Sequence, residues 1–114
     1  MTQSNLWLYF ATCKGFTKIG VSIYPWSRIG EMQTANPFNI RPYHYFYISE
    51  NDWVEKVFHE IFADKRIKGE WFKISRLELE EVKRTFDTGE LESPTKLNKV
   101  QLKKLIDDFK ERRA

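Results

Sequence analysis

The stretch WLYFATCKGFTKIGVSIYPWSR, residues 7–28, determines how the rest of the chain is arranged. In residues 6–11, leucine and phenylalanine side chains alternate with tryptophan, tyrosine and alanine, which is the two-residue period of a β-strand. Residues 13–15 read Cys-Lys-Gly and predict a short turn, because glycine readily adopts a positive φ. A second short strand should follow and stop near Gly20, so the stretch begins with a β-hairpin.

A helix should begin directly after this hairpin. Pro25 suits the first turn of a helix, and Ser22 before it is a candidate cap. Arg28 falls on the same first turn. Tyr9, Lys18 and Arg28 therefore come from three adjacent elements, and a tight fold would bring them to one place. A tyrosine, a lysine and an arginine together indicate a site for a phosphate group.

The next part of the chain predicts a third strand and a helix that packs on the sheet. Residues 41–48 are rich in aromatic side chains, as strands are. Ser49 and Asp52 predict a capping box, and apolar side chains follow at positions 54, 57, 58, 61 and 62, the spacing of a helical stripe. Glu55 and His59 lie one turn apart at the edge of this stripe, where a cleft between helix and sheet would open.

The remaining chain predicts more helix than strand. Residues 64–69 indicate a basic connection and residues 70–74 a short closing strand. A helix over residues 77–86 and a last helix starting at Ser93-Pro94 should follow. The predicted fold class is α/β of the α+β kind, with a small three-stranded antiparallel sheet flanked by helices and a C-terminal helical extension.

Composition sets limits on the kind of protein. The chain has 114 residues, 41% of them apolar, which suffices for one domain with its own core. The single cysteine, Cys13, excludes an intrachain disulfide and a cysteine zinc site. The first residues lack the basic region and long apolar run of a signal peptide or membrane span, so we expect a cytoplasmic protein with no membrane partner.

Positive charge is concentrated at the end of the chain. From Ser93 onward there are seven Lys or Arg against three acids, whereas the preceding residues carry 12 basic and 13 acidic side chains. A cationic tail on a nearly neutral body suits a polyanion partner, and it equally suits an ordinary solvated helix.

An ordered set of short motifs resembles the GIY-YIG nuclease superfamily. The set consists of WLY at 7–9, KIG at 18–20, Arg28, the segment EKVFH at 55–59 and GEWF at 69–72. It is most similar to the phage-reading-frame branch, also named after a meiotically up-regulated gene, in which the second motif is usually KIG. The resemblance covers about residues 6 to 75 and implies a GIY-YIG-like nuclease domain over 1–75, with a helical, basic extension over 76–114 packed on or linked to it.

The resemblance implies a role for each matching residue. Glu55 would hold Mg²⁺ or Mn²⁺, and Arg28 would contact the phosphate. Tyr9 would act on the attacking water, and Lys18 beside it would lower the pKa of Tyr9 by stabilising the phenolate. His59 would support these groups or face the phosphate. Lys18 stands where the family's second tyrosine often stands, Trp7 replaces the first glycine, and the asparagine that many members carry after the helix has no clear counterpart.

Each of these residues also has an ordinary interpretation when taken alone. Tyr9 is typical of a half-buried strand, Lys18 of a solvated strand, and Arg28 of a helix surface. Glu55 and His59 form a common i, i+4 surface pair worth a few tenths of a kcal/mol. Trp71 and Phe72 predict core positions, and Glu70 is expected to brace Arg28 or a backbone amide.

The expected function is therefore a metal-dependent endonuclease of low sequence specificity acting on DNA, with RNA not excluded. Backbone contacts are expected from basic side chains outside the site, namely Lys14, Lys65, Arg66, Lys68, Lys103 and Lys104. Two alternatives remain: a catalytically inactive nucleic-acid-binding module, or a phage or defence protein-interaction domain on the same fold. A homodimer or a protein partner would then dock on the apolar face of the last helix.

Overall fold

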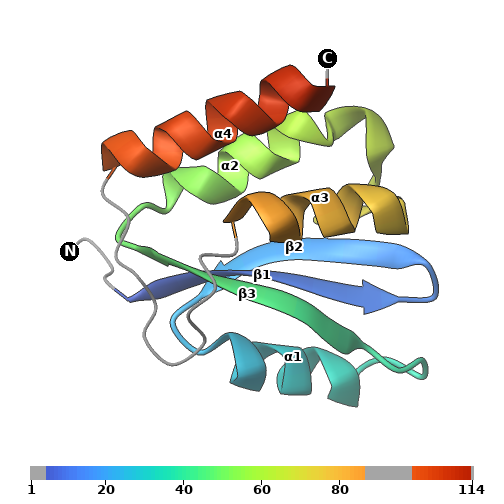
Figure 1. Ribbon diagram of the computed structural model, residues 1–114. Coiled ribbons are helices and arrows are strands. Elements are labelled where there is room, and N and C mark those ends of the chain that lie inside the picture. Colours follow the sequence, from blue (N-terminus) through green and yellow to red (C-terminus); the bar gives the residue numbers. More distant parts are fainter. Residues whose placement is uncertain (1–4, 87–98, 114) are drawn as a thin grey trace.

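The computed structural model describes residues 5–86 and 99–113. A five-stranded antiparallel sheet of order β3-β1-β2-β5-β4 forms the middle layer. One helix, α1, covers one face of the sheet, while α2, α3 and α4 lie over the other (Figure 1). The elements in chain order are β1 (Leu6–Cys13), β2 (Phe16–Ser22), α1 (Pro25–Thr34), β3 (Arg41–Ser49), α2 (Trp53–Ile61), the short 3-10 helix η1 (Ala63–Lys65), β4 (Arg66–Lys68), β5 (Trp71–Phe72), α3 (Arg76–Phe86) and α4 (Lys99–Arg113).

The predicted hairpin is confirmed, with a longer second strand than expected. Lys14 and Gly15 have φ of 54° and 81°, so both turn residues are left-handed, as a tight two-residue hairpin turn requires. β2 does not stop at Gly20, because the ladder with β1 continues until Trp7 pairs with Ser22. β2 therefore extends beyond the end of β5, which is its other neighbour in the sheet.

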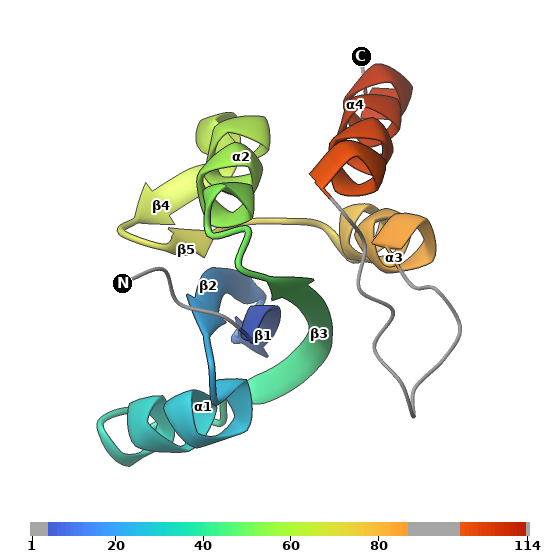
Figure 2. The same cartoon turned by 90° about the vertical axis from the view of Figure 1, so that its left-hand side faces the viewer.

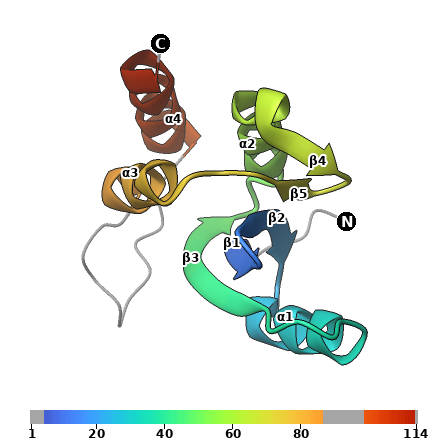
Figure 3. The same cartoon turned by 90° about the vertical axis from the view of Figure 1, so that its right-hand side faces the viewer.

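The sheet has five strands rather than the three of the predicted fold class, although the α+β class itself agrees. The segment expected to be a basic connection contains η1 and β4, and the expected closing strand is the shorter β5. All three residues of β4 are exposed, so this strand shows no alternation of apolar and polar positions that the sequence could have revealed. In Figure 2 and Figure 3, β4 and β5 lie on one side of α2, and α3 lies on the opposite side of that helix.

Alternation along β1 divides the apolar side chains between two cores. Leu8 and Phe10 face α2 and belong to a large core that also contains Phe58 of that helix. Tyr9 and Ala11 point the other way and join a smaller core with Ile29 of α1. Both faces of the sheet are therefore covered, which explains why residues 6–11 are apolar at consecutive positions.

Helices α3 and α4 contribute to the same large core as the sheet. Phe109 of α4 is fully buried, and its ring lies 6.2 Å from those of Phe58 and Phe62. Leu102 and Ile106 of α4 are buried beside it. The apolar face of the last helix, which we expected to bind a partner, is thus covered by the chain's own α2. The predicted helix start at residues 93–94 lies outside the described residues.

Helix starts differ from the caps that the sequence predicted. Pro25 is the first residue of α1 as expected, but the cap residue is Tyr24, and its backbone N–H donates to the Ser22 hydroxyl at 3.0 Å. Ser22 therefore fixes the turn before the helix rather than a helical amide. The capping box predicted from Ser49 is wrong, because α2 is capped at Asp52 without a side-chain hydrogen bond.

No helix in residues 5–86 or 99–113 combines the length and the apolar character needed to cross a membrane.

Candidate functional site

The Tyr9 side chain lies across the neighbouring strand β2 at Gly20. The two residues are register partners in the β1–β2 ladder, and a Cβ at Gly20 would lie 2.5 Å from the Tyr9 hydroxyl oxygen. Only glycine leaves room for the phenol at this position. Tyr9 is 2% exposed, so most of its ring is enclosed while its hydroxyl reaches across β2. This contact explains the glycine of the KIG motif in steric terms.

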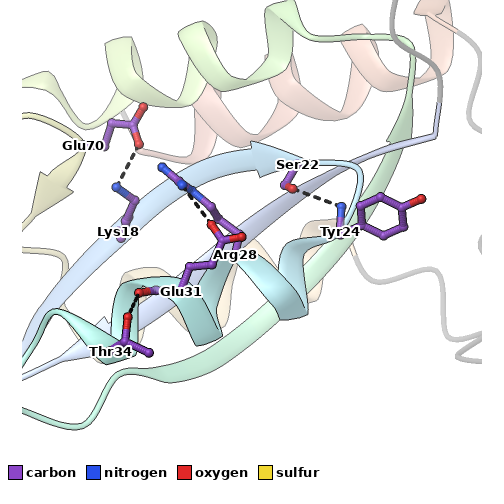
Figure 4. Close-up of polar contacts among 7 residues, drawn as sticks. All are labelled: Lys18, Ser22, Tyr24, Arg28, Glu31, Thr34 and Glu70. Atoms are coloured by element: carbon purple, nitrogen blue, oxygen red, sulfur yellow. Dashed lines mark hydrogen bonds and ion pairs between the residues drawn. The ribbon is translucent and has the colours of Figure 1, made fainter.

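Arg28 reaches the Tyr9 hydroxyl from the first turns of α1. Its guanidinium lies close enough to that hydroxyl to lower the pKa of Tyr9, and it pairs with Glu31 at 3.3 Å. Figure 4 shows the Arg28 side chain extending from α1 across β2. About half of the side chain, 52%, is exposed, so its cationic end contacts both the buried phenol and solvent. An exposed guanidinium fixed in this way is suited to binding an anion.

The edge of β2 positions two polar residues of α2, Glu55 and His59. β5 pairs with β2 at Thr17 and Lys18, and beyond this point the backbone of β2 bonds with other groups. The Ile19 carbonyl accepts a hydrogen bond from His59 Nε2 at 3.0 Å, and the Val21 N–H lies close enough to the Glu55 carboxylate to lower its pKa. Glu55 and His59, one turn apart on α2, therefore both lie against the backbone of a single strand.

The bond to Ile19 determines that Nε2 is one ring nitrogen of His59 that carries a hydrogen. A carbonyl oxygen only accepts, so His59 Nε2 carries the hydrogen and donates it. The ring also lies 5.2 Å from that of Phe72. His59 consequently holds α2 against β2 through Nε2, and its expected support of the neighbouring site groups stays a prediction.

Glu70 completes the cluster, with a partner that the sequence did not indicate. Its carboxylate forms an ion pair with Lys18 at 3.1 Å, and its backbone carbonyl accepts from the Ile19 N–H at 3.1 Å (Figure 4). It therefore pairs with Lys18 rather than bracing Arg28. The pairing of β5 with β2 is what creates this contact, since Glu70 directly precedes Trp71, the β5 partner of Lys18.

Burial and a neighbouring charge oppose ionisation of two groups in the site. Burial raises the pKa of Glu55, and the negative charge of Glu70 raises it further, against the opposing effects of His59, the Val21 N–H and Lys18. Burial also raises the pKa of Tyr9, followed by the charge of Glu70, while Arg28 acts in the opposite direction. The expected lowering of the Tyr9 pKa by Lys18 is therefore wrong. Lys18 is paired with Glu70, and the cation that lowers the pKa of the phenol is Arg28.

The donor set suits a metal held by one carboxylate. Within the described part of the chain, no group of three or more His, Cys, Asp and Glu lies close enough to hold a metal ion by itself. Glu55 is half-buried, and its raised pKa shows that negative charge there lacks full compensation. A hard divalent cation could supply that compensation if phosphate and water completed its oxygen ligands.

The basic residues expected to contact nucleic acid do not form one surface. Lys14 lies in the β1–β2 turn over the ring of Phe38. Lys65, Arg66 and Lys68 belong to η1 and β4, whereas Lys103 and Lys104 are exposed on α4, across α2 from β4 (Figure 2). Lys65 also lines a cavity of about 910 Å³ whose walls include none of Tyr9, Lys18, Arg28, Glu55, His59 and Glu70.

Comparison with known proteins gives one match. A family model described as the T5orf172 domain matches residues 7–88, a segment that includes Tyr9, Lys18, Arg28, Glu55, His59 and Glu70. The matched segment extends through α3. Neither the curated proteins nor the solved structures contain a match to this chain.

Proposed function

The chain belongs to the T5orf172 domain family, and we propose that it is a divalent-metal-dependent endonuclease that hydrolyses phosphodiester bonds in DNA. The family is phage-associated and related to GIY-YIG endonucleases, which is compatible with a nuclease. The observation that carries the proposal is that the motif residues converge on the middle of β2. The Tyr9 hydroxyl from β1 lies against Gly20, and His59, one turn from Glu55 on α2, bonds with the Ile19 carbonyl. Arg28 from the opposite face of the sheet lies close enough to act on the pKa of Tyr9.

Arg28 is the group in this arrangement that would bind the scissile phosphate. Its guanidinium is half exposed and presents several N–H donors in one plane, a geometry that matches two oxygens of a phosphate. It lies beside the Tyr9 hydroxyl. Arg28 would therefore hold the phosphate next to the Tyr9 hydroxyl and stabilise negative charge that develops during hydrolysis.

Tyr9 would orient the attacking water and take its proton. Its hydroxyl is held between the Gly20 backbone and Arg28, so it occupies one defined position. Because its pKa is raised, the phenol is neutral at neutral pH, and the phenolate that can accept a proton becomes more abundant as pH rises. The positive charge of Arg28 favours this phenolate against the effects of burial and Glu70.

Glu55 would hold Mg²⁺ or Mn²⁺. When bound, such an ion supplies positive charge to the phosphate and to the nucleophilic water. The Val21 N–H lies beside the Glu55 carboxylate, and His59 holds the same helix one turn further along. Lys18 keeps the Glu70 carboxylate paired at 3.1 Å, so that Glu70 does not occupy the position of the phosphate.

A binding module that does not cleave is the competing function, and one observation favours it. The raised pKa of Tyr9 makes the phenolate scarce at neutral pH, and Lys18 stands in place of a second tyrosine while paired with Glu70. Such a module would keep Arg28 as a phosphate contact and would have no requirement for a metal at Glu55.

Incubation with supercoiled plasmid tests the proposal. We expect nicking in Mg²⁺ or Mn²⁺ and none in EDTA. Glu55→Ala should reduce nicking by at least about 100-fold, as expected when a group that stabilises the transition state is lost. Glu60→Ala, on the exposed side of the same helix, is the matched control and should leave the rate unchanged. A folded wild-type protein that binds DNA but never nicks it would favour the binding module.

A further inference from the structure

A patch of aromatic side chains lies next to the candidate site. It consists of Trp7 on β1, Tyr47 on β3, and Tyr24 and Trp26 at the start of α1. The ring of Trp7 lies 5.1 Å from that of Tyr47 and 6.4 Å from that of Trp26, and Trp26 lies 6.2 Å from Tyr24. The Tyr47 hydroxyl donates to Asn5 Oδ1 at 2.7 Å. The four rings therefore form one continuous series, which is called the aromatic patch below.

The outer half of the aromatic patch is open to solvent. Tyr24 is 58% exposed and Trp26 is 54% exposed. Their contact is edge-to-face, with 75° between the ring planes, which covers less of each ring than parallel stacking would. Figure 4 shows the Tyr24 ring pointing away from α1. Adjacent exposed aromatic rings on a folded protein commonly mark a surface that binds something.

Two structural elements connect the aromatic patch with the candidate site. Along β1, Trp7 and Tyr9 are two residues apart and share one face of the sheet. Along α1, Tyr24 precedes Arg28 by four residues, and the Arg28 N–H donates to the Tyr24 carbonyl at 3.0 Å. Along the backbone, the exposed rings therefore begin about one helical turn from Arg28, whose guanidinium would bind the phosphate.

We propose that the aromatic patch stacks unpaired bases of a nucleic-acid strand whose phosphate is bound at Arg28. This inference rests on the proposed function, because it takes the site to face a phosphodiester. A base within a duplex has both faces covered by its neighbours, whereas an unpaired base offers a face to an aromatic ring. The preferred substrate is therefore a single strand, or a duplex with unpaired nucleotides beside the cut.

The charge beside the rings decides between a nucleic acid and a protein as the occupant. Arg28 is cationic and 52% exposed, and it follows Tyr24 and Trp26 on the first turns of α1. A strand with alternating phosphates and flat bases complements an arginine followed by aromatic rings. Ile23, which directly precedes Tyr24 and is 39% exposed, is aliphatic rather than aromatic. It would contact the edge of a base or a sugar.

Binding of fluorescein-labelled oligo(dT), measured by anisotropy in EDTA, tests the proposal without cleavage. Wild-type protein should bind the single strand more tightly than a duplex of equal length. Tyr24→Ala combined with Trp26→Ala should weaken binding of the single strand by about tenfold for each ring and leave duplex binding unchanged. Leu77→Ala removes an exposed apolar side chain, 77% exposed, from α3 outside the patch and should have no effect.

A second readout detects the stacking itself. Oligo(dT) should quench tryptophan fluorescence, and Trp26→Phe, which keeps a ring for stacking, should remove much of this quenching while retaining binding. Unchanged quenching in Trp26→Phe, or full single-strand affinity in the double variant, would overturn the proposal. So would a protein partner that co-purifies with the wild type and is lost from the double variant while oligo(dT) binding persists.

The outcomes separate this inference from the proposed function. If the wild type binds oligo(dT) through the rings but cuts neither plasmid nor a labelled single strand in Mg²⁺ or Mn²⁺, the endonuclease is rejected and the stacking surface stands. If the wild type nicks plasmid in a metal-dependent way but the double variant binds oligo(dT) as well as the wild type does, the enzyme stands and the stacking surface is rejected.

Discussion

Tyr9 lies so close to Gly20 of the neighbouring strand that a single added carbon at residue 20 would come within 2.5 Å of its hydroxyl oxygen. The ring is buried and the glycine is its register partner, so neither residue can change without affecting the other. The position of the Tyr9 hydroxyl relative to Arg28 therefore depends on the absence of a side chain at residue 20.

Gly20→Ala should displace Tyr9. The methyl group would overlap the hydroxyl and two ring carbons, so we expect a loss of about 1–3 kcal/mol in the free energy of unfolding and a large fall in nicking rate. Gly30→Ala is the control, because nothing lies within 4 Å of an added Cβ there. On α1 that change should stabilise the protein by about 1 kcal/mol. Urea unfolding and plasmid nicking measure both effects, and equal behaviour of the two variants would show that the ring is not held against residue 20.

Glu70→Gln should move the pH dependence of cleavage to lower pH. The charge of Glu70 favours neutral Tyr9 and raises its pKa, so neutralising residue 70 should lower that pKa and increase the phenolate at any given pH. Lys18, released from its ion pair, would act in the same direction. Nicking rates measured across the pH range, with Glu60→Gln as control, test this. An unmoved profile would mean that Tyr9 is not the group whose ionisation limits the rate.

Glu55→Gln should stabilise the metal-free protein, and increasingly so as pH rises. The folded-state pKa of Glu55 is raised above its ordinary value of 4.5, so its contribution to stability is present below that value and is lost as pH rises through the folded-state pKa. Glutamine is never charged, so it avoids the cost of burying a carboxylate near Glu70, and its side-chain oxygen can still lie beside the Val21 N–H. In thermal melts in EDTA at about pH 4 and about pH 7, the melting temperature of Glu55→Gln should exceed that of the wild type only at the higher pH. Glu60→Gln should melt at the same temperature as the wild type at both.

Mg²⁺ or Mn²⁺ should raise the melting temperature of the wild-type protein at neutral pH. An ion that binds the folded state alone stabilises it by mass action, and Glu55 is the carboxylate expected to hold it. The melting temperature of Glu55→Gln should be the same in EDTA and in metal. A metal-dependent rise of equal size in both proteins would place the ion elsewhere on the chain.

Phe109→Ala should show whether α4 is an integral part of the fold. The ring is 0% exposed and contacts Phe58 and Phe62 of the main core, so its removal should cost about 3–5 kcal/mol. Val100→Ala on the same helix, where the side chain is 78% exposed, should change stability by less than about 0.5 kcal/mol. A small effect of Phe109→Ala in denaturant unfolding would mean that α4 is only loosely attached. The division of the chain at residue 75 remains a prediction.

Local patterns were sufficient to predict most of the elements. The turn at residues 13–15, Pro25 at the start of α1, and the apolar spacing of α2 depend on neighbours in sequence, and the structure confirms each. The motif residues Tyr9, Arg28 and Glu55 were also identified in this way, and the structure brings them together around β2.

The features that the sequence did not predict depend on contacts between distant segments. β4 is fully exposed and has no apolar alternation, so its pairing with β5 left no local signal. The ion pair of Lys18 with Glu70 joins residues 52 positions apart, and the burial that raises the pKa of Tyr9 follows from its position between α1 and β2. The aromatic patch also arises only when β1, β3 and α1 pack together.

The contacts that Glu55 and His59 make with β2 have a consequence for aggregation. An unpaired strand edge is a template for a second copy of the chain. His59 bonds with the Ile19 carbonyl and Glu55 lies beside the Val21 N–H, so these two side chains cover backbone groups that such a copy would use. The residues assigned to chemistry thus also protect the edge of the sheet. We expect a variant lacking both side chains to self-associate through β2, so its oligomeric state should be measured before any loss of activity is attributed to the missing chemistry.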